Sequence, residues 1–280
     1  MPDQNSYQSD IDHILSLRHA NGGDFWASAD GKLYVGNPFS TINCALMLAE
    51  LGVGRDDPAL QGAAGLLFAA QRKDGRFSLG PGAIQPCHTA LAAQTLCYLG
   101  HGSDERLAVT FRHLLETQQP DSGWRCAKFF YGRGPETEHS NPGPTLTALD
   151  AFRFTKHLNR DERLDRAVVF LLRHWETRLP LGPCHHGIGT QFLRVEYPFL
   201  KYNIFHYVFV LSHYAAARQD GRFRDALAHL RSKLADGRVV VEETNPRLRR
   251  LEFCRKGEIS EPAMARYREI RSNLAETAYE

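Results

Sequence analysis

Apolar positions along the chain fall into two kinds of segment that alternate. One kind is apolar on most of its circumference, as in residues 86–99, which open at a proline and stop at Gly100. A helix with this pattern is typical of a protein interior. The other kind has apolar residues on one face only, as at Leu107, Phe111, Leu114 and Leu115. The alternation predicts an all-α protein in which amphipathic outer helices cover mostly apolar inner helices.

Two short elements recur between these helices. A polar loop that contains glycine and ends in an aromatic or apolar anchor closes the amphipathic segments, at residues 15–26, 67–77, 114–124 and 230–239. A proline opens the apolar segments, at Pro38, Pro86, Pro142 and Pro198, with a fifth opening at Pro262. The spacing of about fifty residues predicts a two-layered ring of helices around a central cavity. We expect one domain with repeat units at 10–55, 56–102, 103–158, 159–218 and 219–280.

Polar residues ahead of two outer segments predict where those helices begin. Asp57 precedes Pro58, and Ser103 precedes the acidic pair Asp104 and Glu105. Side-chain oxygens at such positions accept hydrogen bonds from the free amides of a first helical turn. We therefore expect Asp57 and Ser103 to be N-caps.

Composition and charge exclude several classes of partner. The 280 residues hold 34 basic and 32 acidic side chains, for a net charge of +2, which gives no basis for binding nucleic acid or an anionic membrane. No apolar run reaches the roughly 18 residues of a membrane span. The polar N-terminus does not resemble a signal peptide, so we expect a cytoplasmic protein whose six cysteines are thiols or metal ligands.

The repeat loops carry a family resemblance. The segments 71–77 and 119–124 resemble the Gln-Trp repeats of squalene–hopene-type terpene cyclases and of protein prenyltransferase β-subunits. The resemblance covers almost the whole chain. It implies an α/α toroid of four to five helical-hairpin repeats, an active site in the central funnel and a hydrophobic, isoprenoid-like substrate. The Asp-x-Asp-Asp and Asp-Asp-x-x-Asp motifs of terpene enzymes are absent. His88-Thr89 is similar to the zinc-histidine context of the prenyltransferases, which act with a partner subunit.

A second toroid family shares a shorter stretch. Cys184-His185-His186-Gly187-Ile188-Gly189 resembles the Cys-His-Gly-x-x-Gly zinc motif of lanthionine synthetase cyclases, with one histidine inserted. Trp124-Arg125-Cys126 loosely resembles their Trp-Cys pair. This resemblance implies a zinc-dependent enzyme that modifies peptides or thiols.

Cysteines and histidines gather where repeat loops meet the starts of inner helices. Thiolate and imidazole are the ligands that zinc prefers, and a catalytic site needs three of them with one position left open. We predict metal ligands among these residues, and proton-transfer roles for His139 and His186 beside them. The alternative is that the cysteines are small buried hydrophobes and the histidines cap helices. The candidate metal ligands are Cys184, His185, Cys87, His88 and Cys126.

Polar residues interrupt the inner helices at matching positions of the repeat. Gln94, Asp150 and His206 align at one depth, and residues three positions before them share their helix face. Asp150 and His206 are predicted to form an acid–base pair, with Gln94 orienting the substrate. The alternative is a structural network that closes the ring. The remaining candidates for substrate binding are Asn43, Asn203, Tyr98, Tyr197 and Trp124.

Three functional hypotheses follow from these residues. The first is an enzyme that acts on an isoprenoid-like substrate by acid–base chemistry assisted by zinc, without a nucleotide cofactor. The second is a zinc-dependent peptide- or thiol-modifying cyclase of the lanthionine synthetase type. The third is a non-catalytic toroid that binds a lipid or a protein. The sequence leaves open the reaction, the oligomeric state and the need for a partner subunit.

Overall fold

The chain is helical, as its periodicity predicts. The computed structural model describes residues 7–80, 84–126 and 130–275, and within these ranges it contains isolated bridges but no β-strand. The α-helices are α1 (Gln8–Ser16), α2 (Thr41–Glu50), α3 (Pro58–Ala69), α4 (Pro86–Leu96), α5 (Glu105–Glu116), α6 (Pro142–Phe152), α7 (Glu162–Thr177), α8 (Ile204–Leu211), α9 (Ala215–Arg218), α10 (Gly221–Arg231) and α11 (Glu261–Ala275). Short π or 3-10 turns lie at Cys97–His101, Pro135–Glu138, Leu158–Arg160, Pro246–Leu248 and Glu252–Cys254.

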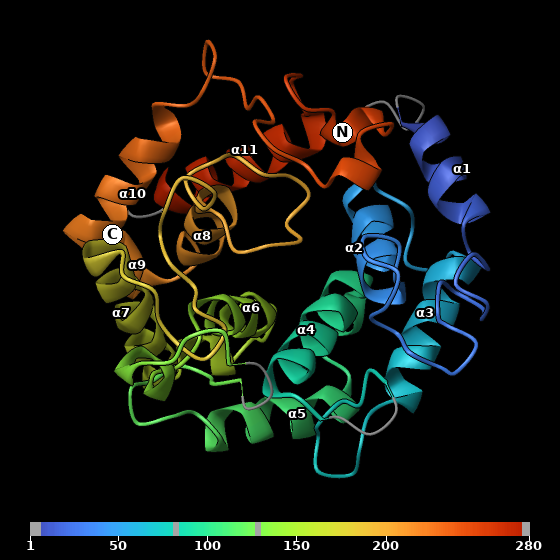
Figure 1. Ribbon diagram of the computed structural model, residues 1–280, viewed down its shortest axis with the longest axis horizontal. Helices are drawn as coiled ribbons and strands as arrows, with labels where there is room; N and C mark the ends of the chain where they lie inside the picture. The colour runs from blue at the N-terminus through green and yellow to red at the C-terminus, as the bar shows by residue number, and fades with distance from the viewer. Residues whose placement is uncertain (1–6, 81–83, 127–129, 276–280) are drawn as a thin grey trace.

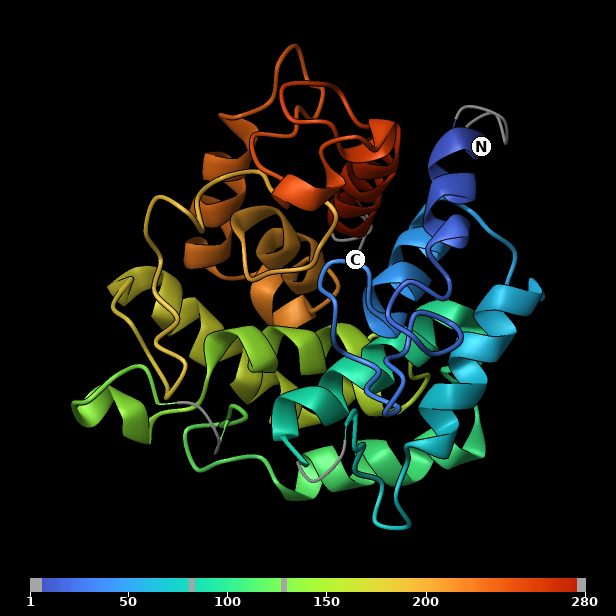
Figure 2. The same cartoon turned by 45° about the vertical axis from the view of Figure 1, so that its right-hand side comes forward.

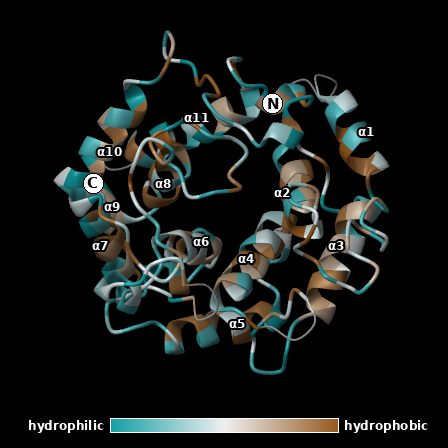
Figure 3. Cartoon of the chain, viewed as in Figure 1, coloured by the Kyte–Doolittle hydropathy of each residue, from teal (hydrophilic) through white to brown (hydrophobic). Residues whose placement is uncertain are grey.

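The helices lie in two rows around a common centre. Figure 1 shows α2, α4, α6, α8 and α11 around the middle, with α1, α3, α5, α7 and α10 outside them. The turned view in Figure 2 shows the same outer helices covering the inner ones. Hydropathy follows this order: every residue of α8 is buried, whereas the outer helix α10 presents hydrophilic residues at the edge of the molecule (Figure 3). None of the helices in the described ranges is long and apolar enough to cross a bilayer.

Proline marks the start of several inner helices, as predicted. α4 begins at Pro86 and α6 at Pro142, and Pro262 lies in the first turn of α11. Proline suits this position because its missing N–H group would have no helical partner there. α2 and α8 differ, since they begin downstream of their prolines and are capped by the side chains of Ser40 and Asn203.

Aspartate caps the outer helices α3, α5, α7 and α10, and at one of them the predicted cap was wrong. Asp57 caps α3 as expected, but α5 is capped by Asp104 rather than Ser103. In α5, α7 and α10 an arginine two residues after the capping aspartate both donates its amide to the carboxylate and forms an ion pair with it. These pairs are Asp104–Arg106, Asp161–Arg163 and Asp220–Arg222.

Hydrogen bonds connect the two repeated elements of the sequence. The backbone N–H of Phe77 donates to Thr89 Oγ1 at 3.1 Å, and that of Trp124 donates to Thr145 Oγ1 at the same distance. Each threonine lies in the first turn of an inner helix, and each aromatic residue ends a repeat loop. The loop anchor and the inner helix of one repeat are therefore held together directly.

The glutamines of the repeat loops connect successive repeats. Gln71 Nε2 donates to the carbonyl oxygen of Arg106 at 2.8 Å, and Gln118 Nε2 donates to that of Arg163 at 2.9 Å. Both acceptors lie in the first turn of the next outer helix. Such equivalent bonds at equivalent positions give a physical reason for the repeat spacing.

Candidate functional site

A cavity of about 570 Å³ lies among the inner helices. This volume is typical of sites for small molecules. Side chains from α2, α4, α6 and α8 and from the segment 184–202 line it. Cys87 and Gln94 both face it, and Gln94 lies roughly two turns further along α4. We call the end of the cavity at Cys87 the rim and the end at Gln94 the floor. Its apolar wall is formed by Leu46, Leu91, Leu146, Phe192, Phe199 and Leu200.

Asp150 lies behind the cavity floor, in contact with the lining residues Gln94 and His206. Its carboxylate is completely buried and accepts hydrogen bonds from Arg153 Nε at 2.5 Å and from Gln94 Nε2 at 2.5 Å. The hydroxyl of Tyr98 donates to it at 3.1 Å, and His206 Nε2 lies 3.5 Å away. The structure thus brings together the three polar residues that the repeat alignment placed at one depth.

The electrostatics of the floor separate the roles of Asp150 and His206. Burial raises the pKa of Asp150, but the charge of Arg153 and the bonds from His206 and Gln94 outweigh it and hold the pKa well below its usual range. An ionised carboxylate can only accept, so the hydrogen of a neutral His206 lies on Nε2 and leaves Nδ1 as an acceptor. His206 lines the cavity and stacks on Phe199. Asp150 can therefore orient His206, and His206 can transfer the proton.

The floor continues into a network of ion pairs between the first and last inner helices. Arg153 Nη1 donates to Glu269 at 3.3 Å, and Arg266 donates to Glu269 at 2.9 Å and to Glu50 at 2.7 Å. Tyr197, a predicted substrate-binding residue, is fully buried and donates its hydroxyl to Glu50 at 2.5 Å. Tyr197 therefore belongs to the network and does not line the cavity.

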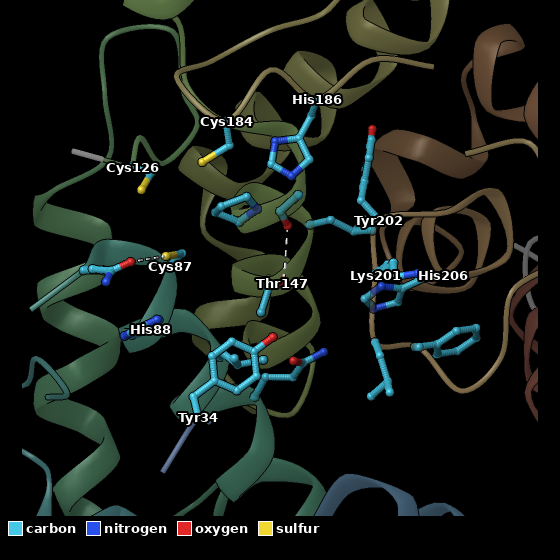
Figure 4. Close-up of a pocket in the computed structure, with 18 of the residues that line it drawn as sticks. Tyr34, Cys87, His88, Cys126, Thr147, Cys184, His186, Lys201, Tyr202 and His206 are labelled. Atoms are coloured by element: carbon cyan, nitrogen blue, oxygen red, sulfur yellow. Dashed lines mark hydrogen bonds between the residues drawn. The ribbon is translucent and has the colours of Figure 1, made fainter. Parts of the chain in front are cut away.

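Three cysteines meet at the rim. Cys126 is within hydrogen-bonding contact of both Cys87 and Cys184, and all three line the cavity. We call Cys87, Cys126 and Cys184 the thiol cluster. Figure 4 shows these thiols and the imidazole of His186 around one side of the cavity, with His206 and Lys201 across from them.

Two thiols of the thiol cluster have raised pKa values. The hydrogen bond with Cys126 and burial raise the pKa of Cys87, and burial together with Cys126 raises that of Cys184 to about 12. Burial also lowers the pKa of His186 to about 4, so its imidazole is neutral at pH 7. The Nδ1 atom of His186 is buried and has no hydrogen-bond partner.

The other candidate histidines, His185, His139 and His88, differ in where they lie. His185 has a positive φ of 57°, which turns its side chain away from the cavity and toward Glu136, 3.8 Å away. It is thus His186, not His185, that takes the position at the cavity wall. His139 also lies outside the cavity, half exposed and 3.7 Å from Asp121. His88 lines the cavity beside Cys87.

The remaining predicted residues divide between packing and the cavity. Trp124 is buried and donates from Nε1 to the carbonyl oxygen of Leu114 at 2.9 Å. Asn203 caps α8 by accepting from the amides of its first turn. Asn43 does line the cavity, and its Nδ2 donates to Asn37 at 3.1 Å.

In the residues that the structure describes, no three His, Cys, Asp or Glu side chains are arranged as ligands of one metal ion. Within the thiol cluster, Cys87 Sγ is turned to Gln85 Oε1, 3.7 Å away. The cluster therefore provides the donor chemistry of a zinc site without its coordination geometry.

Two important residues were not found from the sequence. Arg153 holds Asp150, and it lies three positions after it in an otherwise apolar helix, which is a signal that sequence inspection could have used. Asn141 lies directly before α6 and accepts a hydrogen bond at 2.6 Å from the backbone amide of Cys126. Its local signal is that Pro142 and Pro144, just after it, have no N–H groups to donate to a cap.

Comparisons with known proteins give little further information. No family model matches the sequence, and no curated protein matches it. A solved crystal structure of a protein from Actinoplanes aligns with 96% of this chain and 83% of its own, at 17% identity and a TM-score of 0.46. A similarity this distant supports no statement about function.

Proposed function

We propose that the protein is an enzyme with an α/α-toroid fold of four to five repeats, which encloses an apolar substrate in its central cavity. The observation that carries this proposal is that one cavity of about 570 Å³ has both the thiol cluster and His206 on its wall. The two-row arrangement in Figure 1 and the equivalent hydrogen bonds of successive repeats support the fold. The five repeat boundaries and the single domain remain predictions.

The thiol cluster is the proposed zinc site. Cys126 contacts both Cys87 and Cys184, and the three thiols supply the sulfur donors that zinc prefers. The neutral, unpaired Nδ1 of His186 is a further donor beside them. Cys87, Cys126 and Cys184 would hold the ion. Zinc bound in this way would supply an open position at which a substrate thiol is deprotonated, or an oxygen polarised.

The rest of the reaction depends on residues of the floor and the wall. The apolar wall would bind the hydrocarbon part of an isoprenoid-like substrate and exclude water. His206 Nδ1, oriented through Nε2 by Asp150, would accept or return the proton. Because the cluster favours sulfur chemistry, alkyl transfer to a thiol is the reaction that we place first.

Metal analysis and cysteine variants test the zinc site. We expect purified protein to contain one zinc per chain, and Cys126→Ala and Cys184→Ala to lose it. Cys254→Ala is the matched control, because Cys254 is as fully buried as Cys126 but does not line the cavity. Absence of zinc from the wild-type protein, even after incubation with the metal, would contradict this part of the proposal.

The proton-transfer role needs a turnover assay. Zinc-loaded protein is incubated with an isoprenoid electrophile and a thiol acceptor, and the thioether is detected by mass spectrometry. His206→Gln should lower the rate about 100-fold or more while leaving the melting temperature nearly unchanged. Ligand binding without turnover by any acceptor would favour the non-catalytic, lipid-binding hypothesis.

A peptide-modifying cyclase is the second candidate. Tyr131 lines the cavity and is 70% exposed, and its neighbour Phe130 is 60% exposed. Exposed aromatic residues at the entrance of a cavity suit a substrate that extends beyond it. A cysteine-containing peptide used as acceptor in the same assay distinguishes this candidate, which predicts turnover of peptides but not of small thiols.

A further inference from the structure

Asn141 occupies a helix-capping position but does not act as a cap. It directly precedes α6, yet its side chain makes no hydrogen bond to the first turn. The sequence explains part of this, because Pro142 and Pro144 have no N–H groups to donate. The carboxamide is therefore available for other partners.

The carboxamide is directed at the thiol cluster instead. Its Oδ1 accepts from the backbone amide of Cys126 at 2.6 Å, which fixes the orientation of the amide group. Its Nδ2 then faces the Cys184 side chain. Asn141 is fully buried, and Nδ2 has no hydrogen-bond partner that satisfies it. A protonated thiol is a weak acceptor, whereas a thiolate is a strong one.

The adjoining loop leaves room for this amide. Gly182 has a φ of 74°, and a Cβ atom there would lie 2.6 Å from Asn141 Nδ2. A residue with a side chain is therefore excluded at the point where the amide passes toward Cys184. The backbone N–H of Asn141 is itself held by the carbonyl oxygen of Trp124 at 2.9 Å.

We propose that Asn141 is a positioning residue of the thiol cluster: it fixes Cys126 through Oδ1 and donates from Nδ2 to the sulfur of Cys184 when that sulfur binds zinc. This inference rests on the proposed zinc site. Hydrogen-bond partners of metal ligands commonly change metal affinity by about 10- to 100-fold. Asn141 is the residue of this chain that we expect to have that effect.

Two substitutions test the oxygen and the nitrogen of the Asn141 carboxamide separately. Asn141→Asp keeps an oxygen for the Cys126 amide but removes the donor to Cys184. Its added negative charge would by itself strengthen the binding of a cation. A loss of zinc affinity would therefore come from the lost hydrogen bond to Cys184. Asn141→Ala removes both interactions. Asn43→Asp is the matched control, because it makes the same change on the cavity wall at a residue outside the thiol cluster.

Zinc affinity is measured on the full chain by competition with a chromophoric chelator, and cobalt absorption reports the sulfur ligands independently of activity. We expect Asn141→Asp to bind zinc about 10- to 100-fold more weakly and Asn43→Asp to stay within about twofold of wild type. Wild-type affinity in Asn141→Asp with weak binding in Asn141→Ala would overturn the inference and leave only a structural role. If the wild-type protein binds no zinc, the proposed site fails as well. Should Asn141→Ala not fold, the Asp variant alone decides.

Discussion

The floor and the rim of the cavity are both polar and buried, but two buried nitrogen atoms at the rim lack the hydrogen bonds that the carboxylate of the floor accepts. On the floor, Asp150 accepts from Arg153, Gln94 and Tyr98. At the rim, Nδ1 of His186 and Nδ2 of Asn141 are buried without a hydrogen bond.

The contrast is what we expect if the floor stabilises the fold and the rim is the proposed binding site. A buried polar group without a partner keeps the full cost of its lost hydration. The floor avoids that cost by pairing α2, α4, α6 and α11, so its charged groups act as structure. In the proposed function, zinc or the substrate would offset this cost at the rim. Four predictions test this distinction.

Breaking the floor should have the largest effect. Arg153→Leu leaves the buried carboxylate of Asp150 without its arginine, and we expect it to lower the free energy of unfolding by about 3–5 kcal/mol in urea titrations. The control is Arg255→Leu, which removes an exposed ion pair with Glu252 and should change stability by less than about 0.5 kcal/mol. Equal effects of the two variants would show that the floor is not a structural network.

Zinc should stabilise the rim. At a free zinc concentration 100 times the dissociation constant, we expect a gain of about 2.7 kcal/mol in the free energy of unfolding. Cys184→Ala should lose most of this gain, whereas Glu269→Gln, a floor variant, should keep it. A gain that survives Cys184→Ala would mean that the metal binds elsewhere.

Acid should weaken the floor through Glu269. Burial raises the pKa of Glu269, but the bond with His213 and the charges of Arg153 and Arg266 outweigh it and lower the pKa from 4.5 to about 2. A carboxylate with a lowered pKa in the folded state contributes stability above pH 4.5 and loses it as the pH falls toward 2.

The measurement is the difference in unfolding free energy between the wild-type protein and Glu269→Gln across this range. Other carboxylates titrate in both proteins, so their effects cancel. We expect the difference to shrink by on the order of 1–2 kcal/mol, because a side chain that is 31% exposed is partly screened by water. A constant difference from pH 6 to pH 2.5 would refute the assignment.

The smallest effect distinguishes two adjacent histidines. His185→Ala removes a side chain that is 46% exposed, and we expect stability to change by less than about 0.5 kcal/mol and zinc binding not at all. His186→Ala removes the imidazole at the cavity wall and should weaken zinc binding. The reverse order of effects would place His185, as the sequence first indicated, at the metal.

The repeat alignment explains why part of the site could be predicted from the sequence. Gln94 and Asp150 lie at equivalent depths of α4 and α6, as the repeat alignment required. His206 reaches the same place by a different route, because α8 begins only at Ile204 and His206 lies in its first turn. The alignment identified the right residue while the assumed helix register was wrong for α8.

The rest of the floor could not be predicted in the same way. Arg153 lies on the helix of Asp150 and left a local signal, but Glu50 and Arg266 are 216 positions apart in the chain. Their pairing depends on how α11 packs against α2, and many packings are compatible with the periodicity of either helix.

The sequence alone determined that the chain is helical and where α3, α4 and α6 begin, because these starts depend on a few neighbouring residues: a proline in the first turn and, at α3, an aspartate before it. Only the tertiary structure decided which of His185 and His186 faces the cavity, since that rests on one left-handed backbone angle. It also decided that Cys87, Cys126 and Cys184 meet. The first turn of α4 and two loops of later repeats bring them together, and no local pattern encodes that contact.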